Sequence, residues 1–143
     1  MSAEQSAAKP MRVLVYSDDA HVRATVLAGL GPRPSRELPR VEYIECATEA
    51  AVIQQFDAGK IDLAILDGEA APAGGMGIAR QMKDEIYRCP PILLLIARPQ
   101  DAWLATWSKA EAVVSHPIDP VQLAEATASL LRRRVAAGVV VHQ

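Results

Sequence analysis

The chain has 143 residues, half of them apolar and 22% charged, and a formal net charge of -2. This length and composition predict one globular domain that buries a core without disulfides or metals. The slightly negative charge disfavours nucleic acid or an anionic membrane as a partner. Cys46 and Cys89 are the only cysteines and have no metal-ligand spacing, so we expect both to act as small buried side chains.

The first 46 residues predict a buried strand, a helix and an edge strand. Residues 12–17 (RVLVYS) form a continuous apolar run, which is typical of a strand covered on both faces. A helix is expected after Asp19, with apolar residues at helical spacing, and Gly31 followed by proline ends it. Residues 41–46 (VEYIEC) interrupt their apolar side chains with glutamates, as a strand at the edge of a sheet does.

The middle of the chain continues this alternation. We expect a helix over 48–58, which Gly59 ends, and then a buried strand at 61–66 (IDLAIL). A third helix places Ile78, Met82 and Ile86 on one stripe. The run 92–97 (ILLLIA) predicts the next buried strand.

The last third predicts two helices around a short strand. Trp103, Leu104 and Trp107 indicate a weak helix, and residues 112–115 (AVVS) indicate a strand. The final helix has the clearest start, with Asp119 as N-cap and proline at its first position, and we expect it to run to Arg134.

Five strands, each followed by a helix, predict an α/β fold: a five-stranded parallel sheet of the flavodoxin-like type, with helices on both faces. The common strand order is 2-1-3-4-5, and its ligand site lies beyond the carboxyl ends of strands 1 and 3. We expect the domain to cover residues 11–135, between a disordered tail at 1–10 and a second tail at 136–143.

Three aspartates fall at this switch point. Asp18 and Asp19 end strand 1, and Asp67 ends strand 3. Clustered carboxylates repel one another unless a cation relieves them, and Mg²⁺ is typically held by one or two carboxylates, waters and a phosphate. The cluster therefore predicts a metal site of Asp18, Asp19 and Asp67 that can take a phosphoryl group. The alternative is that Asp19 only caps a helix and Asp67 only ends a strand.

The chain resembles the receiver domains of two-component response regulators over about residues 11–134. The matching segments are VLVYSDD at 13–19, DLAILD at 62–67, ILLLIA at 92–97 and VVSHPIDPVQL at 113–123. The resemblance implies that Asp18 and Asp19 bind Mg²⁺ and that Asp67 is the phosphoacceptor. No organic cofactor is expected, because the acidic turn after strand 1 would repel a phosphate without metal.

The sequence departs from this family at the groups that respond to phosphate. Ile96 stands where the family has a Thr or Ser, and it cannot donate a hydrogen bond to a phosphoryl oxygen. His116 stands where the family has a lysine, which weakens the fixed cation. Val113 replaces the usual aromatic residue, and the loop after Asp67 is longer than usual, with Pro72 five residues on and Gly77 ten.

Two surfaces are candidates for partner binding. Residues 31–40 hold Arg33, Arg36 and Arg40 among three prolines, which suggests an extended basic arm, or else a solvated loop. Trp103 and Trp107 lie four residues apart, as exposed hot-spot residues or as half-buried core residues.

These features predict a stand-alone receiver-like domain, not an enzyme, that works by protein contact as an accessory or regulatory subunit. The chain is similar to actinobacterial orphan receiver-like proteins, one of them associated with respiratory complex I, the NADH:quinone oxidoreductase. That resemblance implies a cytoplasmic protein, or one held peripherally at the cytoplasmic side of the membrane by a protein partner, with no insertion of its own. The alternative is a phosphoacceptor of a phosphorelay, modified at Asp67 by a histidine kinase.

Overall fold

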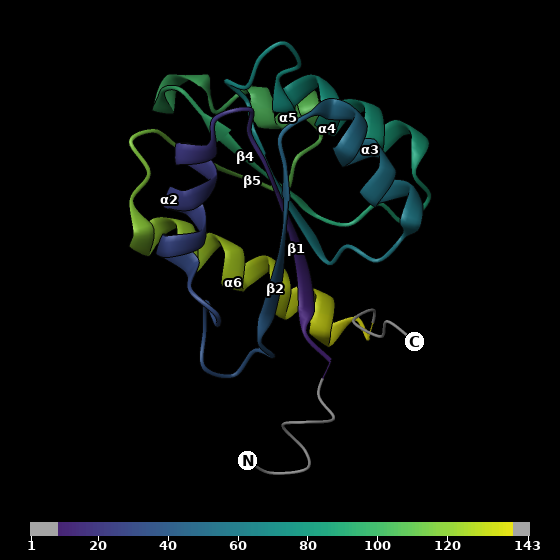
Figure 1. Ribbon diagram of the computed structural model, residues 1–143, viewed down its shortest axis with the longest axis vertical. Helices are drawn as coiled ribbons and strands as arrows, with labels where there is room; N and C mark the ends of the chain where they lie inside the picture. Colours follow the sequence, from purple (N-terminus) through teal and green to yellow (C-terminus); the bar gives the residue numbers. More distant parts are fainter. Residues whose placement is uncertain (1–8, 139–143) are drawn as a thin grey trace.

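The computed structural model describes residues 9–138 as one α/β layer structure. Five parallel strands form a single sheet in the order β2-β1-β3-β4-β5, and helices cover both of its faces (Figure 1). This confirms the predicted strand order and the placement of residues 41–46 at an edge. Of the two predicted tails, residues 1–8 and 139–143 lie outside the described part of the chain.

The strands and helices follow one another in strict alternation. The strands are β1 (Met11–Tyr16), β2 (Val41–Cys46), β3 (Leu63–Asp67), β4 (Ile92–Ile96) and β5 (Ala112–Ser115). The helices are α2 (Ala20–Leu30), α3 (Glu49–Ala58), α4 (Gly75–Glu85), α5 (Leu104–Ser108) and α6 (Pro120–Ala136), with a 3₁₀ turn η1 (Pro99–Asp101) before α5. Within residues 9–138 none of these helices combines the length and apolarity that crossing a bilayer would need.

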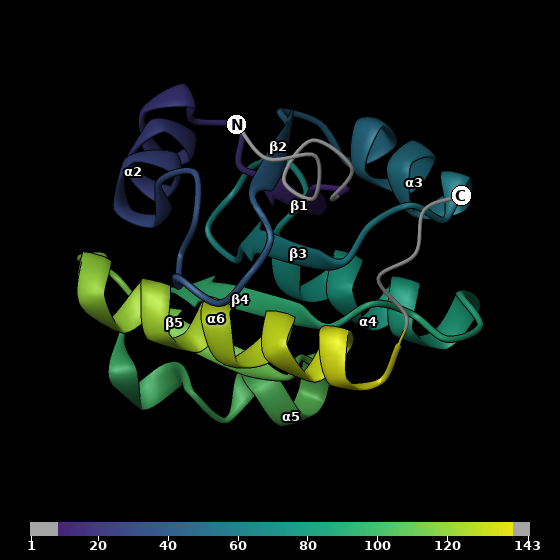
Figure 2. The same ribbon diagram turned by 90° about the horizontal axis from the view of Figure 1, so that it is seen from below.

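Two apolar layers hold the sheet between its helices. Alternate strand residues such as Val13 and Val15 pack with α2 and α6, while Leu14 and Tyr16 pack on the side of α3 and α4. Figure 2 shows the sheet between these two groups of helices. Every residue of β3 and β4 is buried, which is why their sequences read as unbroken apolar runs.

The helix starts match the expected caps. Asp19, Thr48 and Asp119 each accept a backbone N–H of the first helical turn with the side chain. Gly31 (φ 64°) and Gly59 (φ 75°) end α2 and α3 in left-handed backbone geometry that favours glycine.

The segment 31–40 is not an extended arm, which corrects one expectation. Leu38 is buried in the core beside α6, and the Val41 amide donates to the Pro32 carbonyl. Glu37 pairs with Arg132 of α6, with 2.5 Å between Oε1 and Nε. The segment therefore folds back on the domain because it contributes an apolar residue to the core.

Candidate functional site

The three predicted aspartates line one hollow at the carboxyl end of the sheet. This hollow, about 390 Å³, lies beyond β1 and β3, where the strand order reverses. Its lining residues are Asp18, Asp19, Val22, Asp67, Glu69, Ala97 and His116. The sequence thus placed the acids on the correct rim, because the carboxyl ends of parallel strands share one edge.

Asp67 has hydrogen-bond donors at both of its oxygens. The Ser17 hydroxyl donates to Oδ2 (2.8 Å), and the Glu69 amide donates to Oδ1 (2.9 Å). His116 Nε2 lies 3.7 Å from Oδ1. Asp67 is only 3% exposed, so these contacts replace the water that an ionised carboxylate needs.

Sequence reasoning missed Ser17 as a member of this site. Ser17 is fully buried, and besides donating to Asp67 its Oγ accepts the Asp19 amide (3.1 Å). The sequence held one indication of this role: Ser17 is the first residue after β1, and a side chain at that position can reach the end of the neighbouring strand β3.

Asp18 helps to hold the loop that follows β3. Its Oδ1 accepts the Ala71 amide (3.1 Å), and the Tyr16 hydroxyl donates to the Ala73 carbonyl (2.5 Å). Burial first, and then the negative charges of Asp18, Glu49 and Asp67, raise the pKa of Tyr16. The phenol therefore stays protonated as a donor, and the loop is tied to β1 at two points.

Glycines let this loop press against the end of β3. A Cβ on Gly75 would lie 2.8 Å from both Leu66 Cβ and the Asp67 carbonyl oxygen. A Cβ on Gly74 would lie 2.9 Å from the Gly68 carbonyl oxygen. The longer loop thus returns to the strand by close backbone approach, which only glycine allows.

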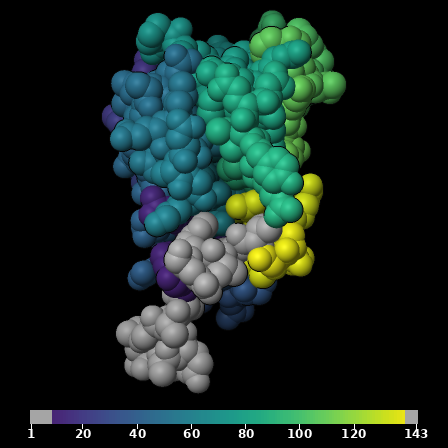
Figure 3. Space-filling model, turned by 90° about the vertical axis from the view of Figure 1, so that its right-hand side faces the viewer, coloured from purple at the N-terminus to yellow at the C-terminus, as the bar shows by residue number. Residues whose placement is uncertain are grey.

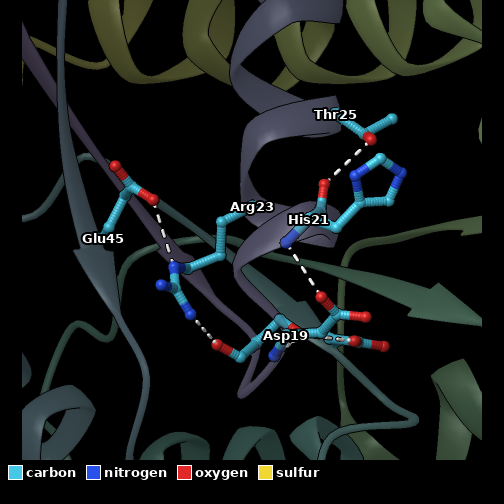
Figure 4. Close-up of polar contacts among 7 residues, drawn as sticks. Asp19, His21, Arg23, Thr25 and Glu45 are labelled. Atoms are coloured by element: carbon cyan, nitrogen blue, oxygen red, sulfur yellow. Dashed lines mark hydrogen bonds and ion pairs between the residues drawn. The ribbon is translucent and has the colours of Figure 1, made fainter.

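Asp19 turns toward the first turn of α2. Its Oδ1 accepts the His21 amide (2.8 Å), as Figure 4 shows. In the same view the Arg23 guanidinium donates to Glu45 (3.1 Å) and to the Ser17 carbonyl (2.6 Å). Asp19 therefore serves as a helix cap while it lines the hollow.

Comparisons with known proteins agree with this geometry. Response regulatory proteins of Mycobacterium tuberculosis strains CDC 1551 and H37Rv, both described as uncharacterised, are each 57% identical over 122 residues. These matches cover 85% of this chain and 92% of each relative. The chain belongs to the response regulator family. No family model matches it.

Solved structures of low sequence identity show that the regulator has the receiver fold. The chemotaxis response regulator CheY4 of Vibrio cholerae has a TM-score of 0.71 at 18% identity, covering 86% of this chain and all of CheY4. A CheY-like receiver domain protein from Methanospirillum hungatei has a TM-score of 0.72 at 17% identity, covering 91% of this chain and all of the other. Receiver-domain response regulators are generally not enzymes.

This response regulator differs from the expected receiver pattern at the end of β4. Ile96 is 2% exposed in the apolar layer on the α3 and α4 side, and Ala97 lines the hollow. Neither side chain has a hydroxyl. His116 donates its backbone amide to the Ile96 carbonyl (2.8 Å), while its buried Nε2 has no hydrogen-bond partner within residues 9–138.

The residues of the hollow fit a metal ion only in part. Receiver domains commonly bind Mg²⁺ at the phosphorylation site. Within the described residues, no three Asp, Glu, His or Cys side chains are grouped to hold a metal ion. Because Mg²⁺ needs only one or two carboxylates beside its waters, Asp18 and Asp67 would be the ligands, and Asp19 is engaged as a cap.

The two predicted partner surfaces lie apart. Arg33, Arg36 and Arg40 are exposed on the segment between α2 and β2, at the bottom of Figure 1. Trp103 and Trp107 belong to α5 and its N-cap, near the top of the same view. They do not form one continuous surface.

Proposed function

We propose that this response regulator acts by constitutive protein contact, as an accessory or regulatory subunit of a larger complex. The observation that carries the proposal is the pair of exposed tryptophans at α5, with Trp103 65% and Trp107 45% exposed. We call Trp103, Trp107 and the adjoining Arg80 the tryptophan face. Large exposed aromatic and arginine side chains are the residue types enriched at binding hot spots.

Trp107 of the tryptophan face is held in place before any partner arrives. The Arg80 guanidinium lies 5.0 Å from the centre of the Trp107 ring, and its NH1 donates to the Trp107 carbonyl (2.9 Å). This cation–π contact orients the ring at small cost. A preorganised aromatic anchor loses little side-chain entropy on binding, which favours stable association.

Contact that does not depend on phosphate follows from the groups at the end of β4. Ile96 and Ala97 offer no hydroxyl to a phosphoryl oxygen, and Val113 is a small side chain where an aromatic switch would stand. Asp67 and Asp18 already bind the loop and Ser17 within the protein. Phosphorylation switches a domain only if some groups interact more favourably with the phosphorylated site in one conformation than in another. The groups that would do so are absent here.

Two partners are candidates for this contact. The resemblance to orphan receiver-like proteins points to respiratory complex I, which would place the chain peripherally at the cytoplasmic side of the membrane. A histidine kinase is the partner that the phosphorelay alternative requires. The two partners are distinguished by what co-purifies with the chain.

The test is affinity purification of the tagged chain from gently solubilised cells, with partners quantified by mass spectrometry. We expect near-equimolar recovery of the subunits of one complex, at least a tenfold loss for Trp103→Ala with Trp107→Ala, and no loss for Asp67→Asn. Tyr87→Ala is the matched control, because Tyr87 is 83% exposed and lies outside the tryptophan face. Recovery of a histidine kinase alone, or loss of the partner in Asp67→Asn, would contradict constitutive docking.

A second candidate function is phosphoacceptance at Asp67. It is favoured by the position of Asp67 in the hollow beside Asp18, with His116 Nε2 3.7 Å from its Oδ1. Incubation with acetyl phosphate and Mg²⁺, followed by intact mass measurement, would show one added phosphoryl group that Asp67→Asn and EDTA both prevent. An unchanged mass, or equal modification of Asp67→Asn, excludes this function.

A further inference from the structure

A second hollow lies at the opposite, amino end of the sheet. It measures about 380 Å³ and is formed by the segment after α4, the start of β5 and the last turns of α6. Figures 2 and 3 show the end of α6 beside the segment that follows α4. We call this the arginine hollow, after Arg88, Arg133 and Arg134 in its lining, which also includes Cys89, Pro91 and Leu130.

The arginine hollow carries more positive than negative charge. Its carboxylate, Glu111, accepts hydrogen bonds from Lys83 Nζ (2.6 Å) and from the Ile92 amide (2.7 Å). The charge of Glu111 is therefore compensated by Lys83 and not by the arginines of the hollow. Within residues 9–138, neither Arg88 nor Arg133 has a carboxylate in ion-pair distance. Two exposed guanidinium groups therefore lie at the rim, and the described part of the chain offers neither of them a counter-charge.

Arg134 supplies a third cation at the base of the hollow. Its NH2 donates to the Ile61 carbonyl (3.2 Å) and lies 3.6 Å from Asp62 Oδ1. Its buried Nε has no hydrogen-bond partner in the described chain. Arg132, the preceding cation on α6, turns to Glu37. Cations at the C-terminal end of a helix interact favourably with the helix dipole. That effect does not explain why Arg133 and Arg134 both line one hollow.

Arg88 is held at the rim by its own backbone and by Tyr87. Arg88 has a φ of 53°, in the left-handed region that a residue other than glycine occupies only at a cost. Its guanidinium lies 5.3 Å from the centre of the Tyr87 ring. A smaller neighbouring hollow of about 230 Å³ shares Arg88 and Arg134 as its wall.

The remaining wall of the arginine hollow is apolar. Pro91, Leu130 and the half-buried Cys89 contribute to it. Burial raises the pKa of the Cys89 thiol to about 11, so the sulfur stays neutral at physiological pH and behaves as an apolar group. Ligand pockets of a few hundred Å³ commonly combine such a wall with a few convergent charged groups.

We propose that the arginine hollow binds a small organic anion, in which a phosphate or carboxylate group is attached to a compact apolar body. Guanidinium groups form strong, charge-assisted and often bidentate hydrogen bonds with both anions. The anion lies against Arg88, Arg133 and Arg134, and the apolar body lies against Leu130 and Pro91. This site is independent of the tryptophan face and of Asp67, so it stands if the proposed docking function fails.

The test is a titration of the ¹⁵N-labelled full chain, followed by ¹H–¹⁵N correlation spectra. The probes are phenyl phosphate and benzoate, with benzyl alcohol as the uncharged control and inorganic phosphate as the control without an apolar body. We expect saturable shifts confined to residues 86–89, 111 and 130–137 with at least one of the two organic anions. Both controls should bind at least tenfold more weakly.

Two double variants decide whether the arginines are responsible. Arg88→Met with Arg133→Met should weaken organic-anion binding at least tenfold, and both residues are exposed, so the fold should be unaffected. Arg36→Met with Arg40→Met removes two exposed arginines outside the hollow and should leave binding unchanged. Shifts centred on Asp67, equal binding by both variants, equal binding of a control probe, or no saturable shifts with either organic anion would overturn the proposal.

Discussion

The two ends of the sheet use charge in opposite ways. At the carboxyl end, Asp18, Asp19 and Asp67 each accept a hydrogen bond from a nearby backbone amide, and Asp67 also accepts the Ser17 hydroxyl. At the amino end, the exposed Arg88 and Arg133 lack carboxylate partners within the described residues. The adjoining turn and the loop after β3 bring backbone amides to these carboxylates, whereas no described segment brings a carboxylate to Arg88 or Arg133.

In this protein the family resemblance and the unpaired charged groups lie at different ends of the sheet. The acidic hollow matches the family in position, but its carboxylates already support the loop and helix around them. The arginine hollow matches no motif, yet two of its arginines, Arg88 and Arg133, have no carboxylate partner among residues 9–138.

The largest loss of unfolding free energy is expected for Arg134→Met, at the amino end of the sheet. Asp62 is completely buried, and losing the cation that lies 3.6 Å away leaves its charge less compensated. Removing one partner of a buried pair costs about 3–5 kcal/mol of unfolding free energy, and we expect a loss of about 3 kcal/mol because the Arg12 amide still donates to Asp62 Oδ2. Urea unfolding at neutral pH measures it.

The control for that variant is Arg132→Met, two residues earlier on the same helix. Arg132 and Glu37 are both about half exposed, so losing their pair should change the unfolding free energy little. Equal losses for the two variants would show that the Arg134 pair is no more important than a surface contact.

A smaller effect is expected at the carboxyl end for Ser17→Ala. The change removes the buried donor to Asp67 Oδ2 and the acceptor of the Asp19 amide. Leaving such a buried group unsatisfied costs about 1–3 kcal/mol. Thermal or urea unfolding measures the loss.

Thr25→Ala is the control for the serine variant, because the Thr25 hydroxyl is exposed and bonds only within its own helix, to the His21 carbonyl. It should cost clearly less than Ser17→Ala. If the two losses match, the Ser17 contact does not stabilise the acidic hollow.

The smallest loss of unfolding free energy is expected for removal of a helix cap, and two such variants can be compared, Asp19→Ala and Asp119→Ala. Both side chains accept the amide two residues on, at 2.8 and 2.9 Å. Loss of such a cap costs about 1 kcal/mol. Asp19 also adds negative charge beside Asp18 and Asp67, so its removal relieves repulsion and should cost less than removal of Asp119.

The two cap variants are compared by urea unfolding at low and at high salt. Salt screens the repulsion around Asp19, so the two losses should converge as its concentration rises. If Asp19→Ala lost more unfolding free energy than Asp119→Ala at low salt, Asp19 would make a stabilising interaction besides its helix cap.

Much of the fold could be predicted from local patterns. Unbroken apolar runs identified β1, β3, β4 and β5, and the two glutamates of residues 41–46 identified the edge strand. The start of β3 was placed two residues early, because Ile61 is apolar and buried although it precedes the strand. For residues 31–40 the sequence left an extended arm and a solvated loop open, because Leu38, which packs in the core, stands alone among prolines and charges.

The candidate site could be predicted only in its position. Three aspartates at strand ends necessarily meet at one edge of a parallel sheet, so Asp18, Asp19 and Asp67 were found together. The sequence did not show which groups donate hydrogen bonds to these carboxylates. Ser17, Ala71 and the Glu69 amide reach them only because of the path of the chain in the folded domain.

The sequence by itself thus determined the strands, the edge strand and the helix caps, since periodicity and capping are encoded by near neighbours along the chain. The strand order, and with it the rim on which the acids lie, followed only from the order that is common for this type of fold. Only the tertiary structure decided that Ser17 donates to Asp67, that Asp18 ties down the loop, and that arginines from α6 and from the segment after α4 share one hollow. These features join residues 45 to 53 positions apart, which no local pattern records.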